Sequence, residues 1–252
     1  MDLETRQLQQ RLEQRQHLPE VLLVKPMTQS TNDDVREIAK TGVQHVLVCS
    51  HQQSAGRGQR QRAWVSPVGN IYLSALLNLN TVIDGRLSLE IALNILHIPS
   101  LKDLDLQIKW PNDLYSLQGK WGGILIEPIS PTQVIVGVGI NIESVADQVQ
   151  DQATTSLVDL GIKNPSRIDL IAEVYVAIQN AGQWFDHQSS NLAARFEQHA
   201  AFKDQQVAFE HIGGISTGRF LGIANDGAVI IDTEQGSQVF YQGRLRLAEG
   251  AS

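Results

Sequence analysis

Residues 45–79 read HVLVCSHQQSAGRGQRQRAWVSPVGNIYLSALLNL, two apolar runs joined by a polar loop. The runs at 45–50 and 70–79 are rich in aliphatic and β-branched residues, which predicts two strands. Residues 52–64 of the loop between them carry three arginines, two glycines and a closing tryptophan: Arg57, Arg60, Arg62, Gly56, Gly58 and Trp64. The segment therefore predicts a sheet with a cationic loop between two of its strands.

This loop stands out because the chain as a whole is acidic. Its 252 residues contain 20 Lys and Arg against 27 Asp and Glu, a formal net charge of −7. Broad, non-specific nucleic-acid binding needs a basic face, so this balance argues against it. The hydrophobic fraction of 42% and the charged fraction of 19% are typical of a globular protein with a proper core.

The sequence shows no sign of export or membrane insertion. The start MDLETRQLQQ lacks the apolar core of a signal peptide, and no stretch reaches the ~20 apolar residues that span a bilayer. The single cysteine, Cys49, lies in an apolar run, which favours a small buried thiol over a nucleophile. We therefore expect a cytoplasmic protein that does not enter a membrane.

The rest of the chain divides into a larger mixed part and a smaller β-rich part. Apolar runs predict further strands at 21–25, 106–110, 123–127 and 133–142. Helical spacing and capping residues predict helices at 2–16, from Ser30 or Thr31 to Gly42, and at 85–96, 167–185 and 192–202. From about residue 205, glycine turns separate short alternating strands, as in a small barrel.

The composition of the Arg/Gly loop (residues 52–64) suits the binding of anions. Glycine allows positive φ angles and a close approach of the backbone to a ligand, and guanidinium forks match phosphate or carboxylate oxygens. A solvated surface turn explains the loop taken alone equally well. An RNA-binding Arg/Gly segment is a third interpretation, although such segments come as repeats and this run is solitary. No Gly-Lys-Ser/Thr follows, which excludes a Walker-type loop, and GVGIN (137–141) lacks the third glycine of a dinucleotide motif.

Two more polar clusters accompany apolar strands. KWPND (109–113) joins a cation, a proline turn and a carboxylate at the end of a strand, where α/β sheets place ligands. GKWGGILIE (119–127) offers Lys120 just before a buried strand. Taken singly, Lys109 and Lys120 are consistent with exposed charges at strand ends. Ser30, Thr31 and Asn32 are likewise consistent with a simple helix cap.

Taken in order, five motifs resemble the signature of the biotin protein ligases. They are STND (30–33), QQSAGRGQRQRAWVSPVGNIYLSALL (52–77), IKWPND (108–113), GKWGGILIE (119–127) and VGVGINI (136–142). The resemblance is strong over residues 20–145 and weaker over TTSLVDLG (154–161) and the glycine-rich C-terminal segment. It implies an α+β fold, with a mixed β-sheet catalytic domain flanked by helices at 1–200 and a small C-terminal SH3-like β-barrel at 201–252.

The resemblance also implies a two-step reaction. The carboxylate of biotin attacks the α-phosphorus of ATP to give biotinyl-5′-AMP and pyrophosphate. A specific lysine of the biotin carboxyl carrier protein of acetyl-CoA carboxylase then attacks the mixed anhydride, which leaves an amide and AMP. Mg²⁺ is expected with ATP, although the sequence shows no dedicated cage of metal ligands. Both reactants of the first step are anionic, so cations must hold them together.

Residue by residue, the resemblance implies three overlapping sets. Catalytic roles fall to Arg57, Lys109, Asp113 and Lys120. Biotin-binding roles fall to Ser30, Thr31, Asn32, Gln53, Arg57, Gly58, Lys120 and Gly122. ATP-binding roles fall to Arg57, Arg60, Arg62, Trp64, Lys109, Asn112 and Asn141. Asp113 would help to position either the incoming lysine or a magnesium ion, and both roles stay open. We expect the loop to order when ligand anions arrive, since its cations repel one another.

The chain departs from the family pattern at three positions. The usual loop reads Gly-Arg-Gly-Arg-Arg-Gly-Arg, whereas here Gln59 replaces an arginine and Gln61 replaces a glycine. Trp121 stands where a smaller aliphatic residue is common. These differences bear on loop flexibility and on retention of the intermediate, but not on the reaction class.

Three other functions are compatible with parts of the sequence. A ligase that is also a repressor would need an N-terminal winged helix of ~60 residues. Only about 20 residues precede the first predicted strand, and this segment is not basic overall, so we expect no DNA binding. A pure biotin-binding module would lack pyrophosphate release. A lipoate ligase shares the fold, but its pattern lacks the pairing of this loop with KWPND. A two-fold homodimer is left open, because the sequence does not show which sheet edge is free.

Overall fold

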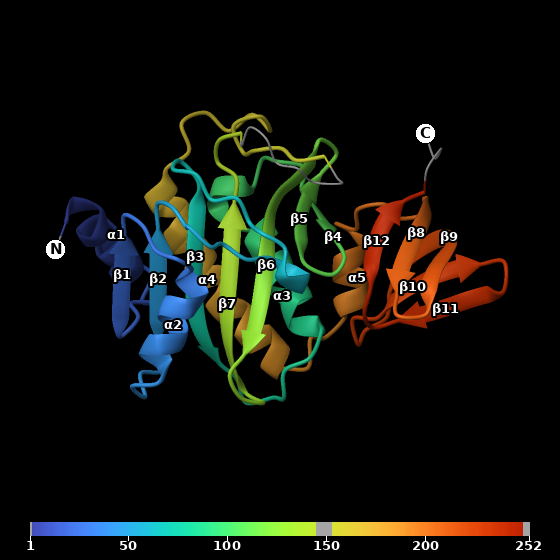
Figure 1. Ribbon diagram of the computed structural model, residues 1–252, viewed down its shortest axis with the longest axis horizontal. Coiled ribbons are helices and arrows are strands. Elements are labelled where there is room, and N and C mark those ends of the chain that lie inside the picture. The colour runs from blue at the N-terminus through green and yellow to red at the C-terminus, as the bar shows by residue number, and fades with distance from the viewer. Residues whose placement is uncertain (1, 145–152, 249–252) are drawn as a thin grey trace.

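The chain folds around a seven-stranded mixed sheet, with a second, smaller sheet beside it (Figure 1). The computed structural model describes residues 2–144 and 153–248. In the large sheet β1 is parallel to β2, and every other neighbouring pair is antiparallel. In spatial order the strands are β1 (Val21–Lys25), β2 (Val46–Ser50), β3 (Ile71–Asn78), β7 (Gln133–Ile140), β6 (Gly119–Pro128), β5 (Asp113–Ser116) and β4 (Gln107–Lys109).

Two long apolar strands, β3 and β7, form the middle of this sheet. They pair along their whole length, from Ile71 opposite Ile140 to Asn78 opposite Gln133. Nearly every residue of both strands is buried, whichever face it points to. A strand with both faces covered reads as a continuous apolar run, which is why the sequence predicts these two so clearly.

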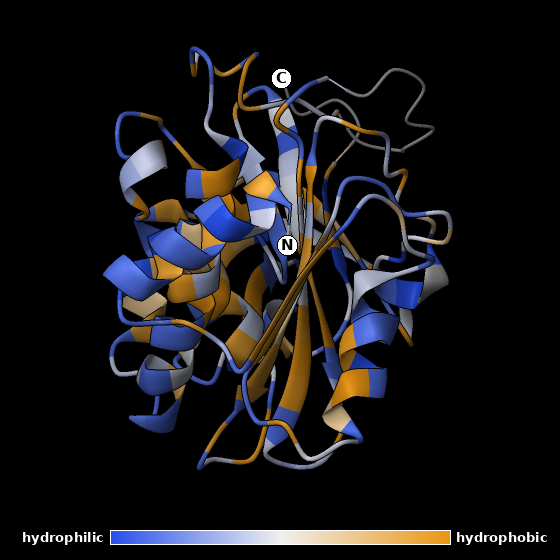
Figure 2. Cartoon of the chain, turned by 90° about the vertical axis from the view of Figure 1, so that its left-hand side faces the viewer, coloured by the Kyte–Doolittle hydropathy of each residue, from blue (hydrophilic) through white to orange (hydrophobic). Residues whose placement is uncertain are grey.

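Helices cover both faces of the sheet, which Figure 2 shows edge-on. They are α1 (Leu3–Gln14), α2 (Thr31–Ala39), α3 (Arg86–Leu96), α4 (Arg167–Asp186) and α5 (Leu192–Glu197), with 3₁₀ turns at η1 (Gln59–Gln61) and η2 (Pro99–Leu101). On one face, Val35 of α2 packs against Val48 and Ile135 of the sheet. On the other, α3 and α4 pack against each other, and α4 also contacts α1 and β3. None of the described helices is long and apolar enough to cross a membrane.

The predicted elements are present, with two differences. The sequence pattern does not predict β5, which is only four residues long. The predicted helix at 192–202 ends at Glu197, because the next residues bind the edge of the large sheet instead. The N–H of Ile108 in β4 donates to the carbonyl of His199 at 2.7 Å, and the N–H of Ala201 donates to the carbonyl of Ile108 at 3.0 Å. Tertiary pairing therefore overrides helical propensity here.

The C-terminal strands form an antiparallel sheet in the order β11-β10-β9-β8-β12. Their bounds are β8 (Gln206–His211), β9 (Gly214–Ile223), β10 (Val229–Thr233), β11 (Gly236–Phe240) and β12 (Arg244–Leu247). The α+β class is confirmed, but the described strands do not close into the expected barrel. Closure would require β11 and β12 to pair, and these strands of five and four residues are the two edges of the sheet.

Trp110 docks the small sheet against the large one. Its Nε1–H donates to the carbonyl of Gly227 at 2.9 Å, and its ring lies 5.6 Å from that of Phe209. Because Trp110 is itself part of KWPND (109–113), this contact places the C-terminal sheet next to that turn. The division of the chain at residue 200 stays a prediction, since residues on both sides of it bind β4.

We predict that Trp121→Leu destabilises the protein by about 2–4 kcal/mol, measured by urea unfolding followed by circular dichroism. Trp121 is fully buried, and its Nε1–H donates to the carbonyl of Tyr115 at 2.8 Å. Leucine would lose this bond and leave a cavity. The control is Trp184→Leu, where the residue is 43% exposed and the expected loss is under about 1 kcal/mol. Equal losses in the two variants would contradict a core-packing role for Trp121.

Candidate active site

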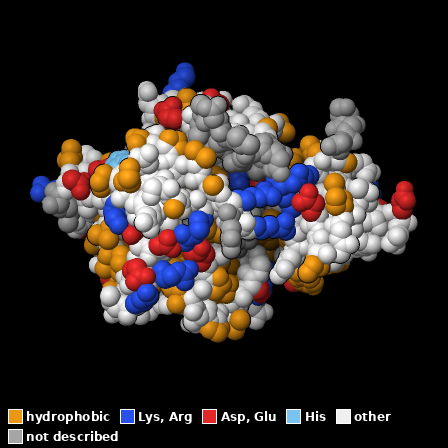
Figure 3. All heavy atoms as spheres, viewed as in Figure 1, with side chains coloured by type: hydrophobic (Ala, Val, Ile, Leu, Met, Phe, Trp, Pro, Cys, Tyr) orange, Lys and Arg blue, Asp and Glu red, His pale blue; other side chains and the backbone are white. Residues whose placement is uncertain are grey.

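A cavity of about 730 Å³ opens between the large sheet, the Arg/Gly loop and the start of β12. Figure 3 shows Lys and Arg side chains gathered in the hollow between the two parts of the molecule. The basic residues that line the cavity are Arg57, Arg60, Arg62, Lys109, Lys120 and Arg244. Asp113 is the acidic residue among the described lining residues. The cavity of this acidic protein is therefore strongly cationic.

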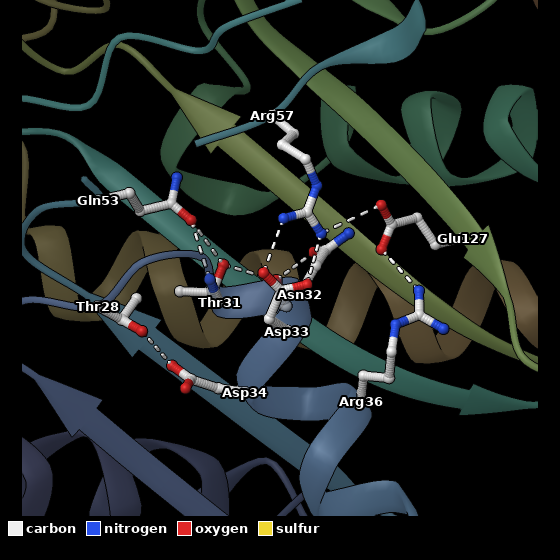
Figure 4. A network of polar contacts seen from close by, with 10 residues as sticks. Thr28, Thr31, Asn32, Asp33, Asp34, Arg36, Gln53, Arg57 and Glu127 are labelled. Atoms are coloured by element: carbon white, nitrogen blue, oxygen red, sulfur yellow. Dashed lines mark hydrogen bonds and ion pairs between the residues drawn. The ribbon is translucent and has the colours of Figure 1, made fainter. Parts of the chain in front are cut away.

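One wall of the cavity is a hydrogen-bonded polar cluster (Figure 4). Gln53 Oε1 accepts from the backbone N–H of Thr31 at 3.0 Å and from its hydroxyl at 3.2 Å. Ser74 Oγ lies 2.7 Å from Thr31 Oγ1 and 2.5 Å from Asn32 Oδ1. Asn32 is only 4% exposed, yet its Nδ2 has no hydrogen-bond partner within the described chain. This wall therefore offers an unused amide donor.

A second polar network surrounds Arg57 (Figure 4). Its Nη1 and Nη2 bind the two carboxylate oxygens of Asp33 at 2.7 and 2.6 Å, and Nη2 also lies 3.4 Å from Glu127 Oε1. The other oxygen of Glu127 accepts from Arg36 Nη2 at 2.9 Å. The hydrogen bonds from Arg57 hold the pKa of Asp33 below its usual range. Arg57 thus meets carboxylates of its own chain, which sequence analysis did not foresee.

Lys109, Asp113 and Lys120 form a third cluster where β4, β5 and β6 adjoin. Lys120 Nζ lies 2.5 Å from Asp113 Oδ1, and Lys109 Nζ lies 3.8 Å from Asp113 Oδ2. The Lys120 ammonium also sits 5.2 Å from the centre of the Trp64 ring. All three charged side chains are largely buried. Two ammonium groups share one carboxylate, so the charges of these three side chains sum to +1.

The Arg/Gly loop is a small hairpin above these clusters. The N–H of Gly58 donates to the carbonyl of Arg62 at 2.8 Å, and the N–H of Trp64 donates to the carbonyl of Gly56 at 2.9 Å. The tip is the 3₁₀ turn η1, where Arg60 takes a positive φ of 55°. Arg60 and Arg62 are exposed, and neither forms an ion pair with another residue in the described ranges.

Most predicted site residues come together in this one cavity. They are Ser30, Thr31, Asn32, Gln53, Arg57, Gly58, Arg60, Arg62, Trp64, Lys109, Asn112, Asp113 and Lys120. Gly122 and Asn141 do not line it. A Cβ on Gly122 would lie 3.0 Å from the side chain of Leu114 in the core. The Nδ2 of the buried Asn141 donates to the carbonyl of Thr155 at 3.1 Å.

Ser74, Glu127 and Arg244 are not among the site residues predicted from the sequence. Ser74 interrupts the apolar run of β3, and Glu127 lies close to the end of β6, so each left a weak signal as a polar residue in a buried strand. Arg244 left no signal, because its position beside the cavity depends on how the C-terminal sheet docks.

The described residues hold no group of three or more His, Cys, Asp or Glu side chains that could hold a metal ion. Cys49 is fully buried, and burial raises its pKa to about 12. It therefore stays a neutral thiol at physiological pH and does not line the cavity.

Both parts of the chain match known protein families. Residues 24–141 match the Biotin/lipoate A/B protein ligase family, and residues 204–250 match the Biotin protein ligase C terminal domain. The first family takes its name from both biotin and lipoate ligases, and the second from biotin protein ligases alone. The cavity is lined from both matched segments.

Individual relatives agree with these matches. The chain is 30% identical over 240 residues to the bifunctional ligase/repressor BirA of Salmonella typhimurium, covering 89% of this chain and 73% of that protein. It is 30% identical over 209 residues to the biotin--[acetyl-CoA-carboxylase] ligase of Mycobacterium tuberculosis, covering 79% and 77%. A solved biotin protein ligase from Aquifex aeolicus, in complex with biotin and ATP, matches with a TM-score of 0.78 at 25% identity and covers 91% of this chain and 100% of that one.

The chain therefore belongs to the biotin protein ligase family. The resemblance carried by the five sequence motifs is confirmed, and with it the assignment to ATP-dependent ligases.

We predict that Cys49 in the folded protein does not react with Ellman's reagent at pH 8 within an hour, because its pKa is about 12 and its sulfur is buried. Addition of guanidinium chloride should release one reactive thiol per chain. Rapid labelling without denaturant would show that Cys49 is accessible.

Proposed function

We propose that this protein activates biotin with ATP and transfers it to a lysine of a biotin carboxyl carrier protein. In the first step the biotin carboxylate oxygen bonds to the α-phosphorus, the bond from that phosphorus to the bridging oxygen breaks, and pyrophosphate leaves. In the second step the lysine amine bonds to the acyl carbon of biotinyl-5′-AMP and loses a proton, the acyl C–O bond breaks, and AMP leaves. The observation that carries the proposal is a single cavity in which a hydrogen-bonding wall meets a cluster of cations.

The polar wall suits the ureido ring of biotin. A ureido group has one carbonyl acceptor and two N–H donors. The unpaired Nδ2–H of Asn32 can donate to the carbonyl, which would recover the roughly 1–3 kcal/mol that a buried unsatisfied donor costs. Oxygens of Ser30, Thr31 and Gln53 are the candidate acceptors. Leu73, Ile124, Leu125 and Val138 supply apolar surface for the valeryl chain.

The cations suit the reacting groups. Lys109 and Lys120 lie largely buried with Asp113, where they would hold the biotin carboxylate and the α-phosphate together and stabilise the charge that develops at phosphorus. Asp113 would fix the positions of both ammonium groups, and we propose that it also orients the incoming lysine. Arg60, Arg62 and Arg244 would bind the outer phosphates of ATP.

Gly122, Asn112 and Asn141 would support the site indirectly. Asn112 lines the cavity, but its Nδ2 donates to the carbonyl of Ile124 at 2.6 Å, so it braces the turn beside β6. Asn141 holds residue 155 against the end of β7 in the same way. These contacts would keep the walls in place for ATP.

Mg²⁺ would reach the cavity bound to ATP, since the described lining residues offer it no dedicated site. The described lining residues include one carboxylate, that of Asp113, and Lys120 already pairs with it. This donor set does not form a dedicated magnesium site, because Mg²⁺ prefers an octahedron of oxygen ligands. Phosphate oxygens and water would therefore supply its coordination.

We propose a cytoplasmic enzyme that acts on biotin rather than lipoate. The match of residues 204–250 to the Biotin protein ligase C terminal domain favours biotin. A homodimer and the absence of DNA binding stay predictions.

The test is to incubate the protein with ATP, Mg²⁺, biotin and a carrier domain. Pyrophosphate release and a mass increase of the carrier are expected with biotin, and little of either with lipoate. Biotin binding without pyrophosphate release would show that the protein is a binding module and not an enzyme. Preference for lipoate would reverse the substrate assignment.

We predict that Lys120→Ala lowers the single-turnover rate of adenylate formation by about 100- to 1,000-fold, because a preorganised cation next to the reacting phosphate is lost. The measurement is rapid-quench formation of biotinyl-5′-AMP, with circular dichroism to confirm the fold. The control is Lys102→Ala on the exposed surface, which should retain full activity. An unchanged rate in folded Lys120→Ala would remove Lys120 from the mechanism.

We predict that Gln59→Arg retains biotinyl-5′-AMP more tightly than the parent. Gln59 lines the cavity at the loop tip but carries no charge, so one charge-assisted contact of about 1–3 kcal/mol is missing. That corresponds to roughly 5- to 150-fold in retention of the intermediate. Adenylate release and labelling of a non-cognate protein should both fall in the variant. Equal release and labelling would show that the glutamine is neutral.

A further inference from the structure

Arg57 has an environment unlike that of the other loop arginines. Its side chain is 33% exposed, whereas Arg60 and Arg62 at the loop tip are exposed. Asp33 occupies both terminal nitrogens of its guanidinium, and Glu127 adds a longer contact to one of them (Figure 4). A guanidinium has five N–H donors in a fixed fork, and the paired face of this fork is already used.

The charges around Arg57 cancel. Arg36 and Arg57 contribute two positive charges, and Asp33 and Glu127 contribute two negative charges. A neutral cluster exerts little net attraction on a phosphate, and two carboxylates would repel one that came close. The other basic residues of the cavity lining are Arg60, Arg62 and Arg244, together with Lys109 and Lys120 of the cluster around Asp113.

The position of Arg57 is the root of the hairpin. Gly56 before it is tightly packed, since a Cβ there would lie 2.5 Å from the carbonyl oxygen of Trp64. Gly58 after it closes the hairpin by its bond to Arg62. Asp33 belongs to α2 and Glu127 to β6, so the ion pairs tie the loop root to a helix and to a sheet strand.

We propose that Arg57 is a positioning residue and that Asp33 and Glu127 anchor it. The anchored root holds the tip, with Arg60 and Arg62, over the cavity. This inference rests on the proposed function. It gives Arg57 the task of placing the groups that contact phosphate, instead of the direct contact with substrate that the sequence resemblance implies. The adenylation step therefore requires an ion pair between positions 33 and 57, and not a cation at position 57.

The test is a charge swap assayed by pyrophosphate release and by the KM for ATP. The singles Arg57→Asp and Asp33→Arg each bring like charges together, and misplaced reacting groups should lower kcat/KM by about 10- to 100-fold. The double variant Asp33→Arg with Arg57→Asp restores an ion pair and should recover most of this loss. A double variant no more active than Arg57→Asp alone would show that the guanidinium itself contacts substrate.

A second pair of variants keeps the test decisive if the swap does not fold. Arg57→Gln leaves Asp33 and Glu127 without their partner, whereas Arg57→Gln with Asp33→Asn replaces the ion pair by an uncharged amide pair. The double should be more active than the single if Arg57 is an anchor. Equal activity would contradict the proposal. The matched control is Glu37→Lys with Lys40→Glu, an exposed ion pair at the C-terminal end of α2, which should leave activity unchanged.

Limited trypsin digestion measures how firmly Arg57 holds the loop, without any activity assay. Cleavage after Arg60 and Arg62 should be faster in Arg57→Gln than in the parent and should slow again in the restored pairs. Unchanged cleavage rates would contradict the anchor even if activity falls. If the parent releases no pyrophosphate with biotin, the proposed function fails, and the digestion still decides whether Arg57 anchors the loop.

Discussion

The site depends on a close approach that only glycine allows in the central strand β7. A Cβ on Gly137 would lie 2.4 Å from Asn32 Oδ1, and one on Gly139 would lie 2.6 Å from the Trp64 ring. The polar end of α2 and the closing residue of the Arg/Gly loop therefore rest directly on the sheet. The cavity exists because one buried strand omits two side chains while its apolar neighbours on β3 and β7 secure the pairing beneath.

Carboxylates pair with some of the cations around the cavity and not with others. Arg57 is neutralised by Asp33 and Glu127, and Lys109 and Lys120 share Asp113. The exposed arginines at the loop tip find no such partner within the described residues. The carboxylates lie at the root of the Arg/Gly loop and next to the two lysines, and not at the tip of the loop. A protein with a net negative charge can therefore have a strongly positive cavity.

The two sheets cooperate through a short interface next to the KWPND turn. Trp110 joins them by a hydrogen bond and an aromatic contact, and Arg244 of the second sheet lines the cavity of the first. A change in docking would therefore alter the phosphate end of the cavity more than its polar wall, since Asn32, Thr31 and Gln53 are held by α2, the loop and β3.

The sequence by itself determined most elements, because apolar periodicity and capping residues act locally, and its five motifs identified the family and thirteen residues that line the cavity. Tertiary structure decided the rest. Arg57 meets Asp33 and Glu127 across 24 and 70 residues, and Ser74 meets Asn32 across 42. The same holds for Arg244, which reaches the cavity only through docking of the C-terminal sheet. Strand order and sheet docking bring these groups together, and neither is encoded in the local pattern around any one of them.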